Sequence, residues 1–319
     1  MERSSLEQIV AKPFSPIHYN MTAAAQPLSV PSLERWNREE GSVYMLNSGD
    51  LAKERERLEY NHYNIWLPLC GGLCPPHILE YLRQLPSPHV AEIATGTGVW
   101  LKDMAKQLPV SAMLRGIDMD STKFPRASEL PPNCSMMQHN ALRPFPEQML
   151  GTFDMVHVRL LRLGLKKEDW ETLAHNIFAL LRPGGYLHWE EVADSSWKCI
   201  PPSRAFDEWK RIETLWAMSV GRDPFMPAQL PIVLRNVGFT DVDEKIWNTY
   251  GVEDKMRGPM TKISTEIVRR VMLAVLEDGG TETLQSMKDI DRLESGMRQD
   301  VLNGALVGFS YTWIWGRHP

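Results

Sequence analysis

From His89 onward the sequence alternates short apolar runs with amphipathic stretches. Parallel strands need covering helices between them, so this alternation predicts βαβ units and a mainly parallel sheet of the α/β class. A strand from Phe239 to about Trp247 and an aromatic last strand, Ala305 to Trp315, would complete the sheet. The other expected strands lie near residues 90–94, 112–118, 134–138, 153–158 and 185–190.

Helical patterns fill the segments between these strands, near residues 98–107, 168–181, 203–219 and 227–237. The second of these helices should end at Pro183-Gly184-Gly185, because proline cannot continue a helix and glycine supplies the positive φ of many helix exits. Two further helices, at 260–277 and 281–302, precede the last strand. The chain therefore makes a long excursion at about 250–303, which we interpret as a helical lid over a substrate site.

Two other parts are expected ahead of the sheet. Residues 1–40 hold four prolines and no sustained periodicity, which is typical of an extended or mobile arm, and such an arm could join two copies in a homodimer. Residues 41–88 are expected to form a helical cap, in which Asp50 can cap a charged helix over 51–67. The sheet and its insertion then occupy 89–319.

Charge and composition narrow the function classes. The net charge is -5, and Lys and Arg are interspersed with Asp and Glu, so a nucleic-acid partner is disfavoured. No signal-peptide pattern and no stretch near the about 20 apolar residues of a membrane span occurs, which predicts a soluble, cytoplasmic protein. The four cysteines lack the spacing of a zinc site, so we predict no metal.

The most informative local signal is the turn after the first strand. Val90 to Ala94 leads into Thr95-Gly96-Thr97-Gly98, at the carboxyl end of a strand, where parallel sheets bind ligands. The two glycines let the backbone turn sharply and approach a ligand closely, although an ordinary tight turn would also use them. Asp118 lies 22 residues after Gly96 at the end of the next strand, where a carboxylate can accept hydrogen bonds from ribose hydroxyls.

Several segments, in order along the chain, resemble one family. VAEIATGTGVW resembles motif I of the class I S-adenosylmethionine (SAM)-dependent methyltransferases, and the other segments resemble their fungal natural-product and regulator-like branch. The resemblance implies a Rossmann-like, seven-stranded, mostly parallel sheet with flanking helices, and SAM as the cofactor. The matching segments are Tyr44-Met45-Leu46, Glu56-Arg57-Leu58 with Asn61-His62, Pro131-Pro132-Asn133-Cys134, Phe153 to Arg159, and Arg182-Pro183-Gly184-Gly185 with Glu190-Glu191.

Carried over position by position, the resemblance implies where SAM binds. Asp118 would hold the ribose hydroxyls, with Met119 and Asn140-Ala141 at the adenine. Tyr44 and His62 match positions that close over the cofactor, and His157 matches one that frames its pocket. The methionine part would lie along Glu92, Ala94, Thr95, Gly96 and Gly98.

The sequence departs from the family pattern at three of these positions. Ala94 replaces the first glycine of the loop, which makes the turn bulkier. Glu92 replaces the usual Asp, so its carboxylate extends one methylene farther. Asn140 also replaces an Asp, but it still offers a carbonyl acceptor. We therefore expect SAM to bind, whereas the orientation of its methyl group is less constrained.

Methyl transfer needs donor and acceptor held in line and, for some acceptors, a base. The candidate catalytic bases are His157, Glu190 and Glu191, together with His188. Side chains alternate across a strand, so Glu190 and Glu191 cannot point the same way. Each candidate could equally be structural: a satisfied strand histidine, or a glutamate at a solvated strand end.

Two further residues are candidates for the substrate site. Arg159 could bind an acidic substrate group or pair with a carboxylate of the protein. Trp197 could wall an apolar pocket together with Trp209, Trp216 and their methionine neighbours, although tryptophans at helical spacing are more often core residues.

Three functions remain open. The first is a methyltransferase that modifies O, N or C of a hydrophobic small molecule in fungal secondary metabolism. The second is a methyltransferase-fold cyclase or pericyclase that binds SAM without consuming it and uses its positive charge as electrostatic support. The third is a methyltransferase-like regulator. The mass of the product separates the first two.

Overall fold

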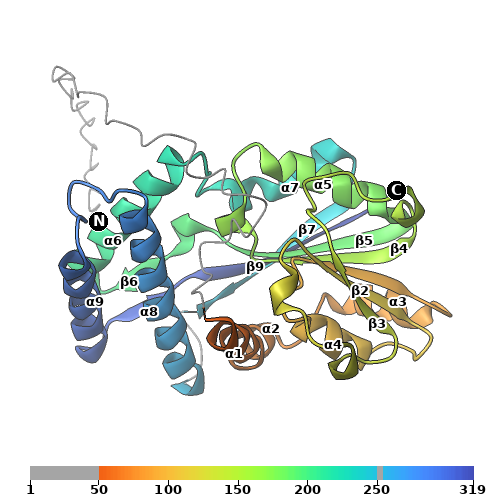
Figure 1. The fold of residues 1–319 in the computed structure, drawn as a ribbon, viewed down its shortest axis with the longest axis horizontal. Coiled ribbons are helices and arrows are strands. Elements are labelled where there is room, and N and C mark those ends of the chain that lie inside the picture. Colours follow the sequence, from red (N-terminus) through yellow and green to blue (C-terminus); the bar gives the residue numbers. More distant parts are fainter. Residues whose placement is uncertain (1–49, 250–253) are drawn as a thin grey trace, which may run out of the picture.

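A single seven-stranded sheet runs through the molecule in the order β3-β2-β1-β4-β5-β9-β7 (Figure 1). The computed structural model describes residues 50–249 and 254–319. Within the sheet, β9 alone is antiparallel to both of its neighbours. This topology confirms the predicted α/β, Rossmann-like class. The strands are β1 (His89–Ile93), β2 (Met113–Asp118), β3 (Cys134–Gln138), β4 (Phe153–Arg159), β5 (Leu181–Val192), β7 (Thr240–Asn248) and β9 (Ser310–Arg317).

Helices cover both faces of the sheet. Figure 1 shows α3 (Pro76–Gln84) and α4 (Val99–Ala105) on one face, and α5 (Asp169–Leu180) and α7 (Met226–Val237) on the other. The central strand β4 is therefore buried on both sides from Phe153 to Val158. Apolar residues therefore occur on both faces of this strand, and its two buried polar residues are bonded to partners: Asp154 accepts the His89 amide and His157 bonds Glu190.

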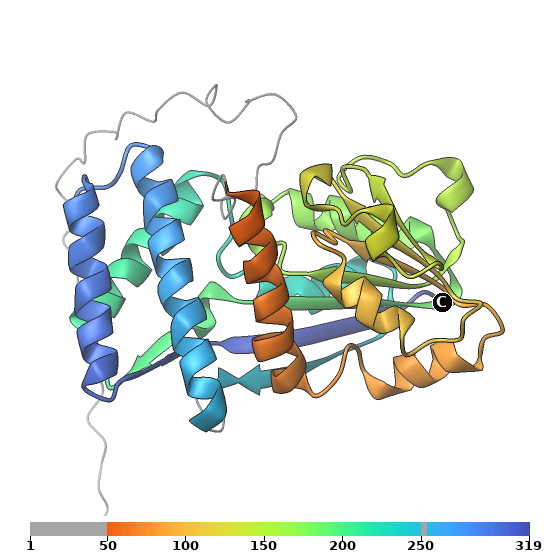
Figure 2. The same ribbon diagram turned by 60° about the horizontal axis from the view of Figure 1, so that its bottom comes forward.

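A separate helical layer lies at one end of the sheet, beyond the point where β9 begins. It consists of α6 (Arg204–Ser219), α8 (Asp254–Glu277) and α9 (Met287–Leu302), which share one apolar core with the first half of β9. The layer is thus larger than the predicted insertion at 250–303, because α6 packs against both α8 and α9. Figure 2 shows α1 lying beside α8 on the same side of the molecule.

The cap helix is longer than its charged segment suggested. Asp50 accepts a hydrogen bond from the Lys53 backbone and starts α1 (Leu51–Asn61), as predicted. A π-helical turn, His62–Trp66, and a short α2 (Leu67–Cys70) continue the same helical path. The path stops at Gly71, whose φ is +71°. Residues 1–49, with the predicted arm and Tyr44, lie outside the described residues.

Three predicted element boundaries were wrong. Helix α5 ends at Leu180, and Pro183-Gly184 lies inside β5, where the Gly184 amide bonds the His318 carbonyl across to the chain after β9. The last helix begins at Met287 because Thr281 pairs with Leu284 in a turn. The predicted last strand is divided: β8 (Leu306–Gly308) leaves the main sheet and pairs with an unpredicted strand, β6 (Lys198–Ile200).

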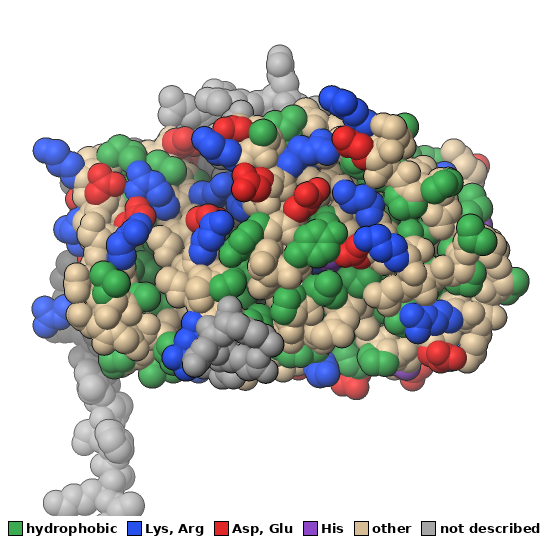
Figure 3. Space-filling view, turned by 90° about the horizontal axis from the view of Figure 1, so that it is seen from below, with side chains coloured by type: hydrophobic (Ala, Val, Ile, Leu, Met, Phe, Trp, Pro, Cys, Tyr) green, Lys and Arg blue, Asp and Glu red, His purple; other side chains and the backbone are tan. Residues whose placement is uncertain are grey.

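The surface carries both signs of charge. On the face shown in Figure 3, Lys and Arg side chains are mixed with Asp and Glu side chains and with apolar ones. No helix in the described parts of the chain is both long and apolar enough to cross a bilayer.

Candidate functional site

The loop after β1 makes a tight backbone turn at the carboxyl edge of the sheet. Ala94, Gly96 and Gly98 have φ values of +56°, +54° and +65°, in the left-handed region that favours glycine. Below the loop, the Thr95 hydroxyl donates to the buried carboxylate of Glu92 at 2.6 Å. Ala94 therefore occupies a position at which a Cβ is costly, as its place in the motif suggested.

Asp118 faces this loop from the end of β2. One carboxylate oxygen accepts the Gly96 amide at 2.9 Å, and the other accepts the Asp120 amide at 3.0 Å. Burial raises the pKa of Asp118, which these two amides and Lys123 oppose. A carboxylate has about four acceptor sites, so it can still bind two hydroxyl groups.

The loop after β1 and the carboxylate of Asp118 border a cavity of about 180 Å³. A bound water needs only about 10–15 Å³, so this cavity is large enough for a ligand. Predicted cofactor residues that line it are Glu92, Ala94, Thr95, Gly96, Asp118, Met119, Asn140 and Ala141. Gly98 and His62 do not line it: Gly98 begins α4 behind the loop, and His62 is buried in the cap.

The cap supplies a wall that the predicted residue set missed. Arg57, Leu58, Asn61 and Trp66 line the cavity from α1 and the π-helical turn. Their helical spacing was the available signal, since residues three to five apart share one face. Arg57 is held by Glu54 through two hydrogen bonds of 3.0 and 2.5 Å, and Glu54 also accepts from Arg270 on α8 at 2.9 Å.

Arg159, which the sequence suggested for the substrate site, lines the cavity from the carboxyl end of β4. Its guanidinium donates to His62 Nδ1 at 3.2 Å, while His62 Nε2 lies 3.0 Å from Asp103. Burial, followed by the charge of Arg159, lowers the pKa of His62 to about 4. The imidazole is thus neutral near pH 7, with its proton toward Asp103 and its free lone pair toward Arg159.

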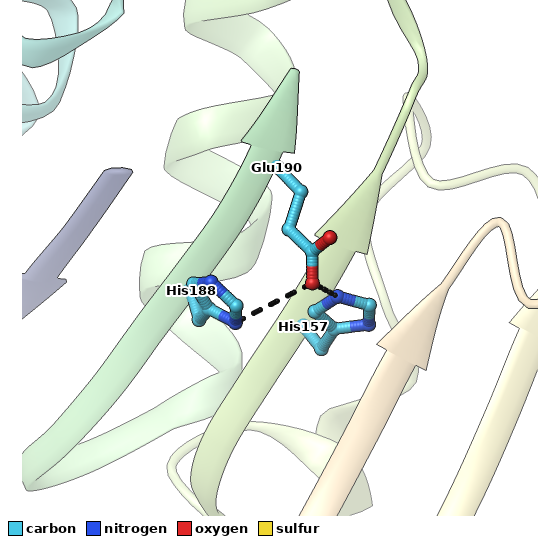
Figure 4. A group of neighbouring side chains, drawn as sticks. All are labelled: His157, His188 and Glu190. Atoms are coloured by element: carbon cyan, nitrogen blue, oxygen red, sulfur yellow. Dashed lines mark hydrogen bonds and ion pairs between the residues drawn. The ribbon is translucent and has the colours of Figure 1, made fainter. Parts of the chain in front are cut away.

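The predicted bases His157 and Glu190 do not line the cavity. Figure 4 shows them with His188, all on adjacent strands and pointing toward one another. His157 Nε2 bonds Glu190 at 2.9 Å, and the His157 ring stacks on Trp100 with centroids 3.7 Å apart. All three side chains of Figure 4 are buried, so a direct reaction with a substrate does not fit their position.

Burial and partners set the charges in this cluster. The pKa of His188 is lowered to about 3, chiefly by burial. Burial alone would raise the pKa of Glu190, but its hydrogen bond and charge interaction with His157 outweigh it and lower that pKa to about 2. Tyr311 donates to the second oxygen of Glu190. Glu190 is therefore an anion enclosed by donors.

The donor atoms of His157, His188 and Glu190 lie within 4.8 Å of one another, the arrangement of a potential metal site. A tetrahedral zinc with ligands at about 2.0–2.2 Å would hold two donors about 3.4 Å apart. His157 and Glu190 are 2.9 Å apart, at direct hydrogen-bonding distance. We therefore interpret His157 and Glu190 as a hydrogen-bonded pair, with His188 Nδ1 3.9 Å from the same carboxylate.

The remaining two predicted residues also lie away from the cavity. Glu191 points to the opposite face of β5 from Glu190, as strand alternation requires, and accepts backbone amides of residues 161 and 162. Trp197 packs in the core of the helical layer against Trp209 and Phe309. It does not line the cavity, because the helical layer buries it.

The loop Leu160–Leu161 completes the cavity and was not predicted. Both leucines line it, and Leu160 has a φ of +56°. Neither its residue type nor its spacing indicates this conformation, since leucine rarely adopts it.

Comparisons with known proteins agree with this architecture. A family described as "Methyltransferase domain" matches residues 90–185. Methyltransferase grgD of a Penicillium species is 29% identical over 82% of this chain and 90% of its own length. N-methyltransferase tcpN of Claviceps purpurea is 27% identical over 78% of this chain and 91% of its own length.

Among solved structures, the [4+2]-cyclase SpnF aligns with 88% of this chain and 98% of its own, at 16% identity and a TM-score of 0.47. The motifs, the strand order and the two relatives that match nearly end to end point the same way. The chain carries a methyltransferase domain over residues 90–185 and is similar, over most of its length, to methyltransferases of fungi.

Proposed function

We propose that this enzyme transfers the methyl group of SAM to an O, N or C atom of a hydrophobic small molecule in fungal secondary metabolism. One observation carries the proposal. The loop residue Gly96, the carboxylate of Asp118 and the strand-end cation Arg159 line a single cavity, and leucines 142, 160, 161, 165 and 173 line it as well. Apolar walls with few polar groups are typical of small-molecule sites.

SAM would lie along the carboxyl edge of β1 and β2. Asp118 has acceptor sites left for the ribose hydroxyls, and Met119 and Asn140 flank the place of the adenine. Arg57 is the natural partner for the methionine carboxylate, because it lines the cavity from α1 and that helix also places Leu58 against Gly96. SAM would supply an activated methyl group there, next to the end of β4 where Arg159 lines the same cavity.

The chemistry is an in-line displacement. A lone pair of the acceptor forms a bond to the methyl carbon while the carbon–sulfur bond breaks, and its electrons return to sulfur to give S-adenosylhomocysteine. The chain's own contribution is to hold the two reactants aligned and to exclude water. An acceptor that is already nucleophilic needs no base, which fits the burial of His157 and Glu190.

Arg159 supports an acceptor molecule with an acidic or strongly polar group. Its hydrogen bond goes to a neutral imidazole, so the positive charge at the cavity is not neutralised through that contact. An anionic group near the guanidinium would gain a charge-assisted hydrogen bond.

Two measurements test the proposal. Titration calorimetry with S-adenosylhomocysteine should show binding to the wild type and strongly weakened binding to Asp118→Ala. Asp291→Ala, on the exposed side of α9, is the matched control and should bind normally. If the wild type does not bind S-adenosylhomocysteine, the proposal is wrong.

The second measurement identifies the reaction. Incubation with methyl-deuterated SAM and a library of hydrophobic fungal metabolites, followed by mass spectrometry, should show products that carry the deuterated methyl group. An isomer of unchanged mass, formed while SAM stays intact, would contradict methyl transfer and support a cyclase.

A further inference from the structure

We infer that Glu191 is a positioning residue, whose carboxylate holds the turn after β4 in the shape that forms one wall of the cavity. This inference rests on the proposed function, because the shape of that wall matters only if the cavity holds SAM and its acceptor. It replaces the general-base role that the sequence suggested for Glu191.

The turn is held in an unfavourable backbone conformation. Directly after Arg159, the chain passes through Leu160 with a φ of +56° and then enters a short 3₁₀ turn, Arg162–Gly164. A branched side chain rarely adopts this φ, so neighbouring contacts must hold it. The conformation has a consequence at the cavity, because residues 159, 160 and 161 all line it.

Glu191 supplies the contacts that hold the turn. Its Oε1 accepts the backbone amides of Leu161 at 2.6 Å and Arg162 at 3.0 Å. From the strand side, the Leu160 amide donates to the Glu190 carbonyl at 2.9 Å. Three consecutive amides of the turn are thus bonded to two consecutive residues of β5.

The surroundings of Glu191 fit a structural anchor. Its side chain is 1% exposed, and Trp189 donates to the same Oε1 at 3.4 Å. Behind the turn, the guanidinium of Arg162 lies 3.6 Å from Glu213 on α6, which links the turn to the helical layer. Burial raises the pKa of Glu191 to about 7, so the neutral acid is accessible, and its carbonyl oxygen can still accept the amides.

Two substitutions of Glu191 distinguish an anchor of the turn from a general base. Because Oε1 receives both turn amides and Oε2 accepts only the Val192 amide, at 3.3 Å, the carbonyl of Glu191→Gln can still hold the turn, whereas Glu191→Leu cannot accept a hydrogen bond. A general base would be lost in both variants. An anchor would be lost only in the leucine variant.

Hydrogen exchange of the Leu161 and Arg162 amides measures the anchor directly. We expect E191Q to keep their slow exchange, and E191L to accelerate it by at least about tenfold while the amides of β1 stay protected. Calorimetry with S-adenosylhomocysteine should show an affinity within about twofold of wild type for E191Q and about tenfold weaker binding for E191L.

A second variant keeps the test decisive if E191L folds poorly. Leu160→Gly adopts the required φ without strain, so the double variant L160G/E191L should regain part of the exchange protection and affinity that E191L loses. L160G alone serves as its control, because it removes the same side chain from the cavity.

Two results would overturn the inference. One is unchanged exchange of both amides in E191L, and the other is equally fast exchange in E191Q and E191L. Failure of the proposed function looks different: a wild type that does not bind S-adenosylhomocysteine leaves the exchange result interpretable. Once an acceptor is known, loss of kcat in E191Q would restore the general-base role.

Discussion

Leu58 on α1 lies directly against Gly96 in the loop after β1. A Cβ added to Gly96 would come within 3.3 Å of Leu58 Cδ1, and Gly96 has a φ of +54°. With a side chain at residue 96, Leu58 or the loop would have to move by a few tenths of an ångström. Contact and conformation therefore both favour glycine here.

Gly96→Ala should weaken the binding of S-adenosylhomocysteine by about tenfold (about 1.4 kcal/mol), because the added Cβ displaces the loop or the Leu58 side chain, both of which line the cavity. The positive φ should also lower the free energy of unfolding by about 1 kcal/mol. Gly151→Ala is the matched control, since its φ is +65° but a Cβ there meets nothing within 4 Å. Urea unfolding should show a similar loss of stability in both variants. Calorimetry should show a loss of affinity in Gly96→Ala alone. Equal affinities of the two variants would contradict the proposed contact with Leu58.

Ala94→Gly should stabilise the protein. The Ala94 Cβ is strained at a φ of +56°, and removing it gains about 1–2 kcal/mol, offset by up to about 1 kcal/mol of extra chain entropy in the unfolded state. Asp241→Gly, at a φ of +50° in the edge strand β7, is the control. Aspartate tolerates this conformation better, so its gain in urea unfolding should be smaller. A loss of stability in Ala94→Gly would show that the alanine side chain contributes packing that outweighs its strain.

Glu54 joins the cap to the helical layer, because its buried carboxylate binds Arg57 on α1 and Arg270 on α8. Breaking such a buried pair typically costs about 3–5 kcal/mol, so Glu54→Gln should unfold at clearly lower urea concentration. Glu208→Gln breaks the more exposed pair with Arg292 and should cost under about 1 kcal/mol. Similar costs in the two variants would mean that Glu54 is better solvated than its burial indicates.

The sequence predicted the features that depend on local patterns. Strand β3 was expected at 134–138 and spans those residues, and the glycine loop and Asp118 meet at the cavity as their spacing indicated. A short run between turn-forming residues indicates a strand, and a tight turn needs glycine, so both features can be recognised from the local sequence.

Features that depend on pairing between distant segments could not be recognised from the local sequence. Strands β6 and β8 have three residues each and pair across more than a hundred positions. Pro183-Gly184 was expected only to end a helix, but it belongs to β5, where the Gly184 amide donates to the distant His318 carbonyl. The depth of His157 and Glu190 below the cavity was equally hidden: alternation decides which face a side chain takes, but not whether a helix such as α4 covers it.

His62 should make stability depend on pH. Burial and Arg159 lower its folded pKa to about 4, whereas the unfolded value is near 6.5. The folded state therefore disfavours the proton: the stability that neutral His62 allows is complete above pH 6.5 and is lost as the pH falls toward 4. Between pH 7 and 5 this loss amounts to about 2 kcal/mol.

His62→Gln removes this titration, so its free energy of unfolding should fall less steeply than that of wild type over the same pH range. His188 and Glu191 also titrate with shifted pKa values, but they contribute equally to both proteins and cancel in the comparison. His175→Gln, at an exposed site on α5, should keep the wild-type slope. Urea unfolding at pH 5, 6 and 7 gives the three slopes. If His62→Gln follows wild type, the imidazole takes up its proton in the fold at the same pH as in the unfolded chain, so the shift caused by burial and Arg159 is absent.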